Sequence, residues 1–175
     1  MHHDMRLFLS ALSVCLEEEN IGKAKEMLSS YSSHIDNARL KKYCSMDTIN
    51  YILSDFEAKC TETGTGFEHE VKIDHLAVDV NMFSSILSNA LDNALDAQKE
   101  LPQESRSVRL MLKGKLLLSV ENPIAAAPRF ADGLPVSKKE GHGYGTQSIR
   151  YMTERLGGKW QFSVKESTFI LKVII

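Results

Sequence analysis

The chain has 175 residues, 43% of them apolar, and a formal net charge of −2. This length suffices for one ordinary domain or for a compact domain with a helical appendage. The small net charge, without long runs of like charge, gives no electrostatic footprint of a nucleic-acid binder, and the apolar stretches are too short to cross a bilayer. We therefore expect a soluble globular protein with no nucleic-acid partner.

The first 62 residues carry apolar side chains at helical spacing. One stripe runs along residues 5–16 and restarts after a break that we expect near Asn20, and another runs from Ile49 to Cys60 and ends before the glycines at 64 and 66. We predict a helical hairpin over residues 1–62. Its narrow stripes resemble a coiled-coil seam, so we expect two copies to pair as a four-helix bundle. The alternative is that the hairpin packs on the C-terminal part of its own chain.

The three cysteines, Cys15, Cys44 and Cys60, lack the spacing of a metal site. We expect buried, reduced thiols rather than a disulfide or metal ligands. The helical pattern begins almost at once, without a signal sequence, so we expect a piece of a longer protein, with His2 a residue of uncertain origin.

The pattern changes after residue 66. Alternation predicts strands at 67–73, 108–112, 116–120, 160–164 and 169–175, while helical periodicity predicts helices at 81–101 and 146–156. The long loop at 123–145 contains most of the prolines and suggests a functional segment. The predicted fold class is α+β, with a domain at 67–175 that is an α/β sandwich with helices on one face of a mixed sheet.

Short polar side chains gather on one face of the helix around Asn89. Asn89, Asp92, Asn93 and Asp96 fall within about 100° of one another. A solvated face is the simple alternative, but such faces usually carry Lys, Glu and Gln, which are better helix formers. Amide and carboxylate oxygens one turn apart suit a hard cation such as Mg²⁺, which keeps water and phosphate oxygens among its ligands.

The second candidate is a glycine-rich segment just before a predicted helix. It consists of Gly141, His142, Gly143, Tyr144 and Gly145, and it follows Lys138. Closely spaced glycines let backbone N–H groups approach phosphate oxygens, and the helix N-terminus adds partial positive charge. A flexible turn is the alternative for this segment taken alone.

Together, the stretch Asn-Ala-Leu-Asp-Asn-Ala-Leu-Asp-Ala at 89–97 and the stretch Gly-His-Gly-Tyr-Gly-Thr-Gln-Ser-Ile at 141–149 resemble the N box and second glycine box of the GHKL ATPase superfamily. The resemblance implies that Asn93, with Asn89 nearby, holds Mg²⁺ and phosphate oxygens, and that residues 141–145 cradle the triphosphate of ATP. The usual Asp-x-Gly-x-Gly box is absent, and Glu121-Asn122-Pro123 stands in its place. In the branch similar to peptide quorum-sensing receptor kinases an Asn is common there, so Asn122 is the candidate adenine contact.

The N-terminal His3-Asp4-Met5-Arg6 is similar to the His-Asp motif of the same kinase branch. The resemblance makes His3 the phosphoacceptor and Asp4 the carboxylate that holds its other ring proton. A tag remnant or an exposed residue at a helix start is the alternative for His3. Transfer requires the ATP-binding domain to swing, and we expect the linker at 61–66 to allow it.

The combined prediction is the cytoplasmic core of a membrane-anchored sensor histidine kinase. It would be a homodimer that uses ATP and Mg²⁺ to phosphorylate His3 and passes the phosphoryl group to a response regulator, with contact to the membrane only through a sensor region outside this chain. Three alternatives stay open: an ATP-independent phosphotransferase of the same fold, a pseudokinase that only binds, and a non-kinase GHKL ATPase. The last would need a Glu in the N box, where Asn89 stands.

Overall fold

The computed structural model describes residues 2–32, 41–114, 116–136 and 144–175, and within residues 2–8 and 29–32 it describes the backbone alone. The chain divides into two compact units, Met1–Arg39 and Leu40–Ile175. No helix within these described ranges is long and apolar enough to cross a membrane.

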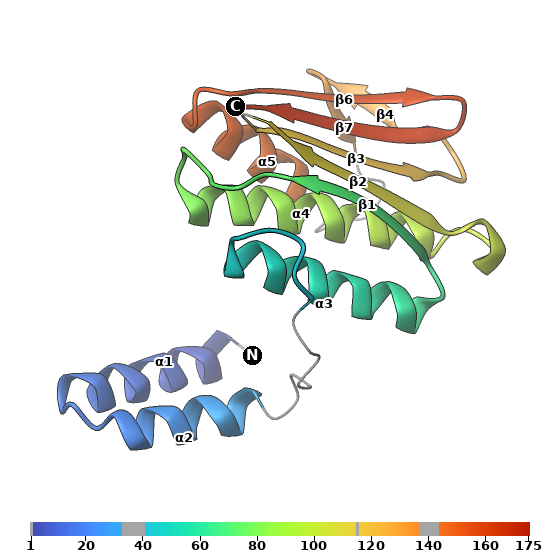
Figure 1. Cartoon of the computed structure of the whole chain (residues 1–175). Helices are drawn as coiled ribbons and strands as arrows, with labels where there is room; N and C mark the ends of the chain where they lie inside the picture. The colour runs from blue at the N-terminus through green and yellow to red at the C-terminus, as the bar shows by residue number, and fades with distance from the viewer. Residues whose placement is uncertain (1, 33–40, 115, 137–143) are drawn as a thin grey trace. The chain divides into compact units, whose positions relative to one another are not determined.

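The N-terminal unit is a pair of helices, α1 (His2–Glu17) and α2 (Ile21–Ser32), which lie side by side (Figure 1). The expected break near Asn20 is confirmed, because the Asn20 side chain accepts a hydrogen bond from the Lys23 backbone N–H at 3.1 Å and caps α2. Cys15 and Ala24 are buried in this pair. Large apolar side chains nevertheless remain 45–52% exposed along both helices: Leu9, Val14, Leu16, Ile21 and Leu28. Pairing with a second copy therefore stays a prediction.

The second unit contains the other helices and all the described strands. The helices are α3 (Asp47–Thr63), α4 (Val80–Gln98) and α5 (Tyr144–Arg155), with a short 3-10 turn at Gln103–Ser105. The strands are β1 (Gly66–Lys72), β2 (Ser107–Lys113), β3 (Leu117–Pro123), β4 (Arg129–Ala131), β5 (Leu134–Val136), β6 (Lys159–Lys165) and β7 (Thr168–Ile174). The longer elements match their predicted ranges to within a few residues.

A five-stranded sheet in the order β1-β2-β3-β7-β6 forms one layer of this unit. The β1–β2 pair is parallel and the remaining pairs are antiparallel, so the predicted mixed sheet is confirmed. Helices α4 and α5 cover one face of the sheet, and α3 packs on α4 (Figure 1). The strands β4 and β5 form a separate two-stranded sheet.

The two faces of the sheet differ in chemistry because side chains alternate along each strand. On β2, Val108, Leu110 and Leu112 point to the helices and are at most 1% exposed. The opposite face carries ion pairs such as Arg109 with Glu68, whose atoms Nη2 and Oε2 lie 2.8 Å apart. One face is thus the core and the other faces solvent.

Helix α3 belongs to this second core, and the division of the chain therefore differs from the expected hairpin at 1–62. Ile49, Leu53 and Phe56 are at most 2% exposed, and the ring of Phe56 meets that of Phe67 on β1 edge-on, with centroids 4.9 Å apart. The apolar stripe was recognised correctly, but its period does not say which partner buries it. The three cysteines are free; Cys15 and Cys60 are buried as expected, whereas Cys44 is half-buried.

The segment 61–66 is fixed inside the second unit, so it is not the swinging linker that the sequence suggested. Gly64 ends α3 in the left-handed conformation, with φ of 63°. The Gly66 N–H donates to the Arg106 carbonyl at 2.9 Å, and the Arg106 guanidinium donates to the Thr63 carbonyl at 3.0 Å. The turn is thereby tied to the start of β2.

Candidate functional site

Helix α4 places the candidate polar residues beneath the sheet. Asp79 caps its N-terminus by accepting a hydrogen bond from the Met82 N–H at 2.8 Å. Phe83, Ile86 and Leu87 are fully buried and set the rotation of the helix. The side chains on its other faces are consequently presented to α3, to α5 and to solvent.

Asn89 and Asn93 lie one turn apart on α4, and both face the first turn of α5. A methyl group on Gly145 would lie 3.0 Å from Asn93 Oδ1, 3.1 Å from Asn93 Nδ2 and 3.4 Å from Asn89 Oδ1. A Cβ at 145 would therefore be tight against the Asn93 amide, which would have to shift by a few tenths of an ångström, and would touch Asn89. The tertiary structure therefore joins the polar face of α4 to the last glycine of the glycine-rich segment.

The orientation of the two amides leaves oxygen atoms available at this point. Asn89 donates its Nδ2 to the Ser85 carbonyl at 2.8 Å, which leaves Oδ1 on the side of Gly145. Asn93 is exposed and makes no side-chain hydrogen bond within the described part of the chain. Two amide oxygens that converge beside a helix N-terminus fit the needs of Mg²⁺, which completes its octahedron with water and phosphate oxygens.

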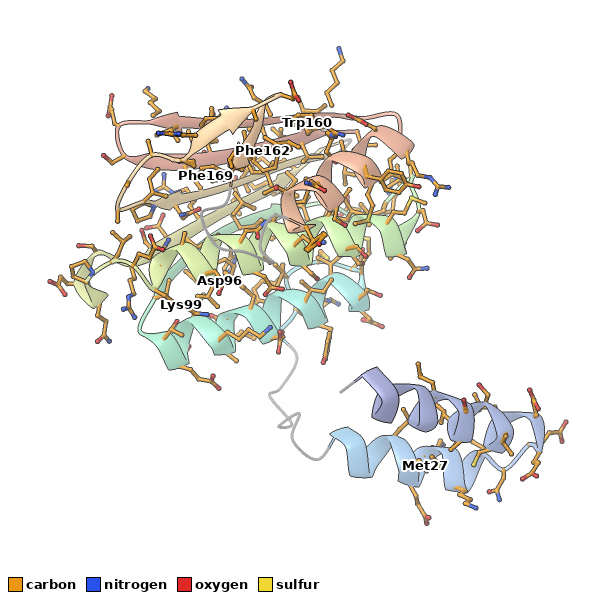
Figure 2. All side chains as sticks on the ribbon, turned by 180° about the vertical axis from the view of Figure 1, so that it is seen from behind. Met27, Asp96, Lys99, Trp160, Phe162 and Phe169 are labelled. Atoms are coloured by element: carbon orange, nitrogen blue, oxygen red, sulfur yellow. The ribbon has the colours of Figure 1, made fainter. Side chains whose placement is uncertain are left out.

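The two carboxylates of the predicted polar face have other partners. Asp92 turns to α3, where its Oδ1 lies 3.8 Å from Lys59 Nζ. The hydrogen bond that Lys59 donates to Asp55, at 2.7 Å, raises the pKa of Lys59, with a smaller contribution from Asp92. Asp96 pairs with Lys99 at 2.6 Å on the outside of α4 (Figure 2). The predicted face thus divides, and only its asparagines meet α5.

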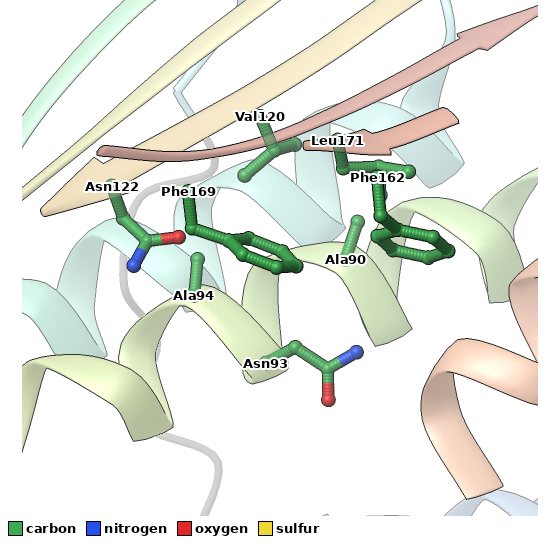
Figure 3. Close-up of a pocket in the computed structure, with 8 residues that line it drawn as sticks. All are labelled: Ala90, Asn93, Ala94, Val120, Asn122, Phe162, Phe169 and Leu171. Carbon is green, nitrogen blue, oxygen red and sulfur yellow. The ribbon is translucent and has the colours of Figure 1, made fainter. Parts of the chain in front are cut away.

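A pocket lies between α4 and the covered face of the sheet (Figure 3). Its walls are Ala90, Asn93, Ala94, Val120, Asn122, Phe162, Phe169 and Leu171. Asn122 stands at the end of β3, opposite Phe169 on β7, and is 3% exposed. The ring centroids of Phe162 and Phe169, both in the pocket wall, lie 5.9 Å apart.

The space left in this pocket is about 10 Å³, close to what one water molecule needs. Sites for drug-sized ligands hold roughly 300–1,000 Å³. A nucleobase therefore requires the pocket to widen, whereas the end at Asn93 and Gly145 opens to solvent. Of the groups expected to bind ATP and Mg²⁺, Asn89, Asn93 and Gly145 lie together, and the space beside Asn122 is too small for a nucleobase in this structure.

The remaining predicted site residues are described less fully. Tyr144 begins α5 and is 76% exposed. Lys138, Gly141, His142 and Gly143 lie outside the described residues. His3 and Asp4 belong to α1, where the description covers the backbone alone.

Sequence reasoning missed Phe162 and Phe169 as pocket residues. The alternation of side chains along each of the last two strands does predict that both phenylalanines lie on the covered face of the sheet. The register between the strands could not be predicted. Asn122 pairs with Phe169 and Phe162 pairs with Leu171, and these pairings bring both phenylalanines to one pocket.

Comparisons with known proteins agree with this architecture. The profile of a family described as the GHKL domain matches residues 78–175. The fold is similar to the nucleotide-free catalytic domain of the histidine kinase ThkA, with a TM-score of 0.56 and 17% identity over 73% of this chain and 89% of that chain. It is also similar to the Acinetobacter baumannii histidine kinase AdeS, with a TM-score of 0.54 and 16% identity over 98% of this chain and 95% of that chain.

A mycobacterial sensor histidine kinase, MprB, gives a TM-score of 0.56 and 16% identity over 73% of this chain and 90% of that chain. No curated protein sequence matches the chain at a significant level. At these identities the structural likeness establishes the fold, and the family match covers more than half of the sequence.

Proposed function

The chain belongs to the GHKL domain family, and on that premise we propose that it is the catalytic core of a sensor histidine kinase. In this proposal it transfers the γ-phosphoryl group of ATP to His3 and then to a response regulator. The observation that carries the proposal is the contact of Asn89 and Asn93 with Gly145. It brings together residues that stand more than fifty positions apart in the chain, which supports a joint site for a metal and a phosphate group.

The phosphate end of the site has a defined role for each group. The side chains of Asn89 and Asn93 would hold Mg²⁺, which when bound neutralises charge on the phosphates. The N-terminus of α5 would hold phosphate oxygens through backbone N–H groups and its partial positive charge. Phosphoryl transfer asks mainly for such positioning and charge neutralisation.

His3 is the proposed acceptor. A neutral imidazole nitrogen of His3 would form a bond to the γ-phosphorus while the bond from that phosphorus to its bridging oxygen breaks, and ADP leaves. Asp4 would accept a hydrogen bond from the other ring nitrogen and stabilise the developing positive charge. Neighbouring residues of a helix do not face each other, so this role requires a favourable pair of rotamers.

The exposed apolar side chains of the N-terminal unit support a homodimer. Among the described side chains of these two short helices, Cys15 and Ala24 are buried, whereas Leu9 and Leu16 stay about half exposed. A second copy would cover these stripes in a four-helix bundle. We propose further that the chain works in the cytoplasm as part of a membrane-anchored receptor.

The test is incubation of the protein with γ-labelled ATP and Mg²⁺. We expect an acid-labile, base-stable phosphate that is lost in His3→Gln and kept in His75→Gln, a change at an exposed histidine outside the site. Labelling that survives His3→Gln would show that another residue is the acceptor. Asn93→Ala should also abolish labelling while leaving the oligomeric state unchanged.

One observation favours a second candidate function, an ATP-independent phosphotransferase. The base end of the pocket leaves only about 10 Å³, and the usual Asp box is absent. A phosphotransferase would show no nucleotide binding by calorimetry and no labelling by ATP, yet His3 would take up phosphate from a phosphorylated response regulator. That combination of results would replace the kinase proposal.

A further inference from the structure

A groove lies between α3 and α4, two helices that pack side by side in the second unit (Figure 1). Its volume is about 110 Å³, much larger than the space beside Asn122. Its apolar wall includes Ile52, Phe56 and Leu91, and the last two of these are at most 2% exposed. Tyr51 also lines the groove and is 44% exposed. The second unit therefore has a hollow with an apolar base outside the candidate site described above.

The charged side chains that line this groove carry more negative than positive charge. Lys59 donates to Asp55 on the same helix, with Nζ and Oδ2 2.7 Å apart. Asp92 on α4 lies 3.8 Å from Lys59 Nζ, which is longer than a hydrogen bond. Within the described part of the chain, the Asp92 carboxylate accepts no hydrogen bond. One ammonium group thus serves two carboxylates, and the oxygens of Asp92 stay open to a second cation.

The lining selects the chemistry of an occupant. Two carboxylates repel an anion, and a purely apolar group would cover Asp92 without offering it a partner, which costs free energy. An apolar stem with a cationic head meets both conditions, because the stem can pack on Phe56 and Leu91 while the head reaches Asp92 and the ring of Tyr51. Arginine suits these groups better than lysine, since a planar guanidinium can give a carboxylate two N–H bonds and can stack on an aromatic ring.

We propose that this groove is a docking site for an arginine side chain of a protein partner. A cavity of about 150 Å³ can hold benzene, whereas sites for drug-sized ligands hold roughly 300–1,000 Å³, so the groove has the size of one side chain. Arginine and tyrosine are also frequent among the residues that dominate protein–protein binding energy. Lys59 keeps its pair with Asp55, and Asp92 gains the hydrogen bonds that it lacks. Docking does not require the proposed kinase function, because the groove is on the α3 side of α4.

The test is an NMR titration of the full, isotope-labelled chain with N-acetyl-arginine amide in the absence of nucleotide. A ligand of this size should bind in the millimolar range, with saturable shifts of the backbone signals of residues 51–59 and 88–92. N-acetyl-citrulline amide has nearly the same shape without the charge, and it should bind about threefold more weakly or worse, as expected of an exposed ion pair. Equal binding of the two probes, a lack of saturation, or shifts confined to other residues would overturn the proposal.

Two variants test the individual contacts at exposed positions, where a substitution disturbs the fold least. Asp92→Asn removes the charge and should weaken the arginine probe about threefold or more, while the affinity for the citrulline probe stays the same. Tyr51→Leu should weaken the arginine probe about two- to fivefold, the loss expected of a cation–π contact at an exposed site. Full affinity in both variants would contradict the assignment of these contacts.

The matched control is Asp132→Asn, the same change at an exposed aspartate between β4 and β5. The φ of Asp132 is 50°, a conformation that asparagine also tolerates, and the variant should bind the arginine probe as the parent protein does. A loss as large as that of Asp92→Asn would show that the probe responds to surface charge in general, which would refute a specific site.

Three more probes distinguish the other occupants. N-acetyl-leucine amide represents an apolar side chain and N-acetyl-glutamate amide an acidic one, and both should bind more weakly than the arginine probe. Spermidine represents a free polyamine and should bind no more tightly than the arginine probe, because it has no planar group to match Asp92 and Tyr51. Tighter binding of any of these three would assign the groove to that occupant and overturn the proposal.

Discussion

Replacing Gly145 by alanine should separate the stability of the fold from the function of the site. The new methyl group would lie 3.0 and 3.1 Å from the amide atoms of Asn93, closer than an ordinary van der Waals contact. Gly145 is the second residue of α5 and does not have positive φ, so alanine suits its backbone. The exposed Asn93 amide must then shift by a few tenths of an ångström.

The gain in helix propensity and the cost of displacing Asn93 contribute to the free energy of unfolding with opposite signs. Alanine in place of glycine in a helix stabilises it by about 0.5–1 kcal/mol, and moving an exposed side chain costs little. We therefore expect the midpoint of thermal unfolding to stay the same or to rise by about 2–4 °C. Displacement of a group in a site by about 1 Å costs on the order of 100-fold in rate, so the smaller shift here should lower Mg²⁺-dependent labelling by about tenfold or more.

The matched control is Gly22→Ala. Gly22 is likewise the second residue of its helix, α2, and a methyl group there meets only Asn20 Oδ1, at 3.9 Å. It should give the same gain in helix stability without loss of labelling. The reasoning fails if Gly145→Ala binds Mg²⁺ and ATP, and is labelled, within twofold of the parent protein.

Three further predictions concern the anchoring of the second unit. Asn50 is 6% exposed and makes three hydrogen bonds of 2.9–3.0 Å with the backbone of residues 43–44. Asn50→Ala should therefore lower the free energy of unfolding by about 2–4 kcal/mol in urea titrations. A loss below 1 kcal/mol would contradict this. Hydrogen bonds from Lys41 and then from Tyr43 hold the pKa of Glu57 below its usual value of 4.5. The resulting stability is present above pH 4.5 and is lost as the pH falls through the lower folded-state pKa, so Glu57→Gln should flatten the stability–pH curve in that range; an unchanged curve would refute the assignment. Burial raises the pKa of the Cys60 thiol to about 11. Mass spectrometry after treatment with a thiol reagent at pH 8 should therefore find Cys60 modified only in unfolded protein, and rapid modification in the native state would count against a buried thiol.

Local patterns predicted most of the secondary structure and singled out the asparagines and the glycine that lie together in the structure. Alternation and helical periodicity placed the longer strands and helices of the second unit to within a few residues. The unusual asparagines of α4 and the glycines before α5 were recognisable by composition alone. These features depend on short-range geometry, and the local spacing of residues in the sequence is enough to predict them.

The partners of those elements could not be predicted in the same way. The stripe of α3 was visible, but its packing on α4 and β1 was not. The polar face of α4 was visible, yet Asp92 turns to Lys59 while Asn93 turns to Gly145. A residue's angle around a helix is set by the sequence, whereas the neighbour at that angle is set by how whole elements pack.

The sequence by itself therefore determined the element types and the mixed α+β class, and it singled out Asn89, Asn93 and Gly145, which the structure brings together. The tertiary structure decided that the second unit begins at Leu40, that Phe169 lies opposite Asn122, and that the Pro123 carbonyl accepts hydrogen bonds from Gln98 and Asn122. The physical reason is that strand register and helix docking depend on contacts between residues far apart in the chain, and no local period encodes them.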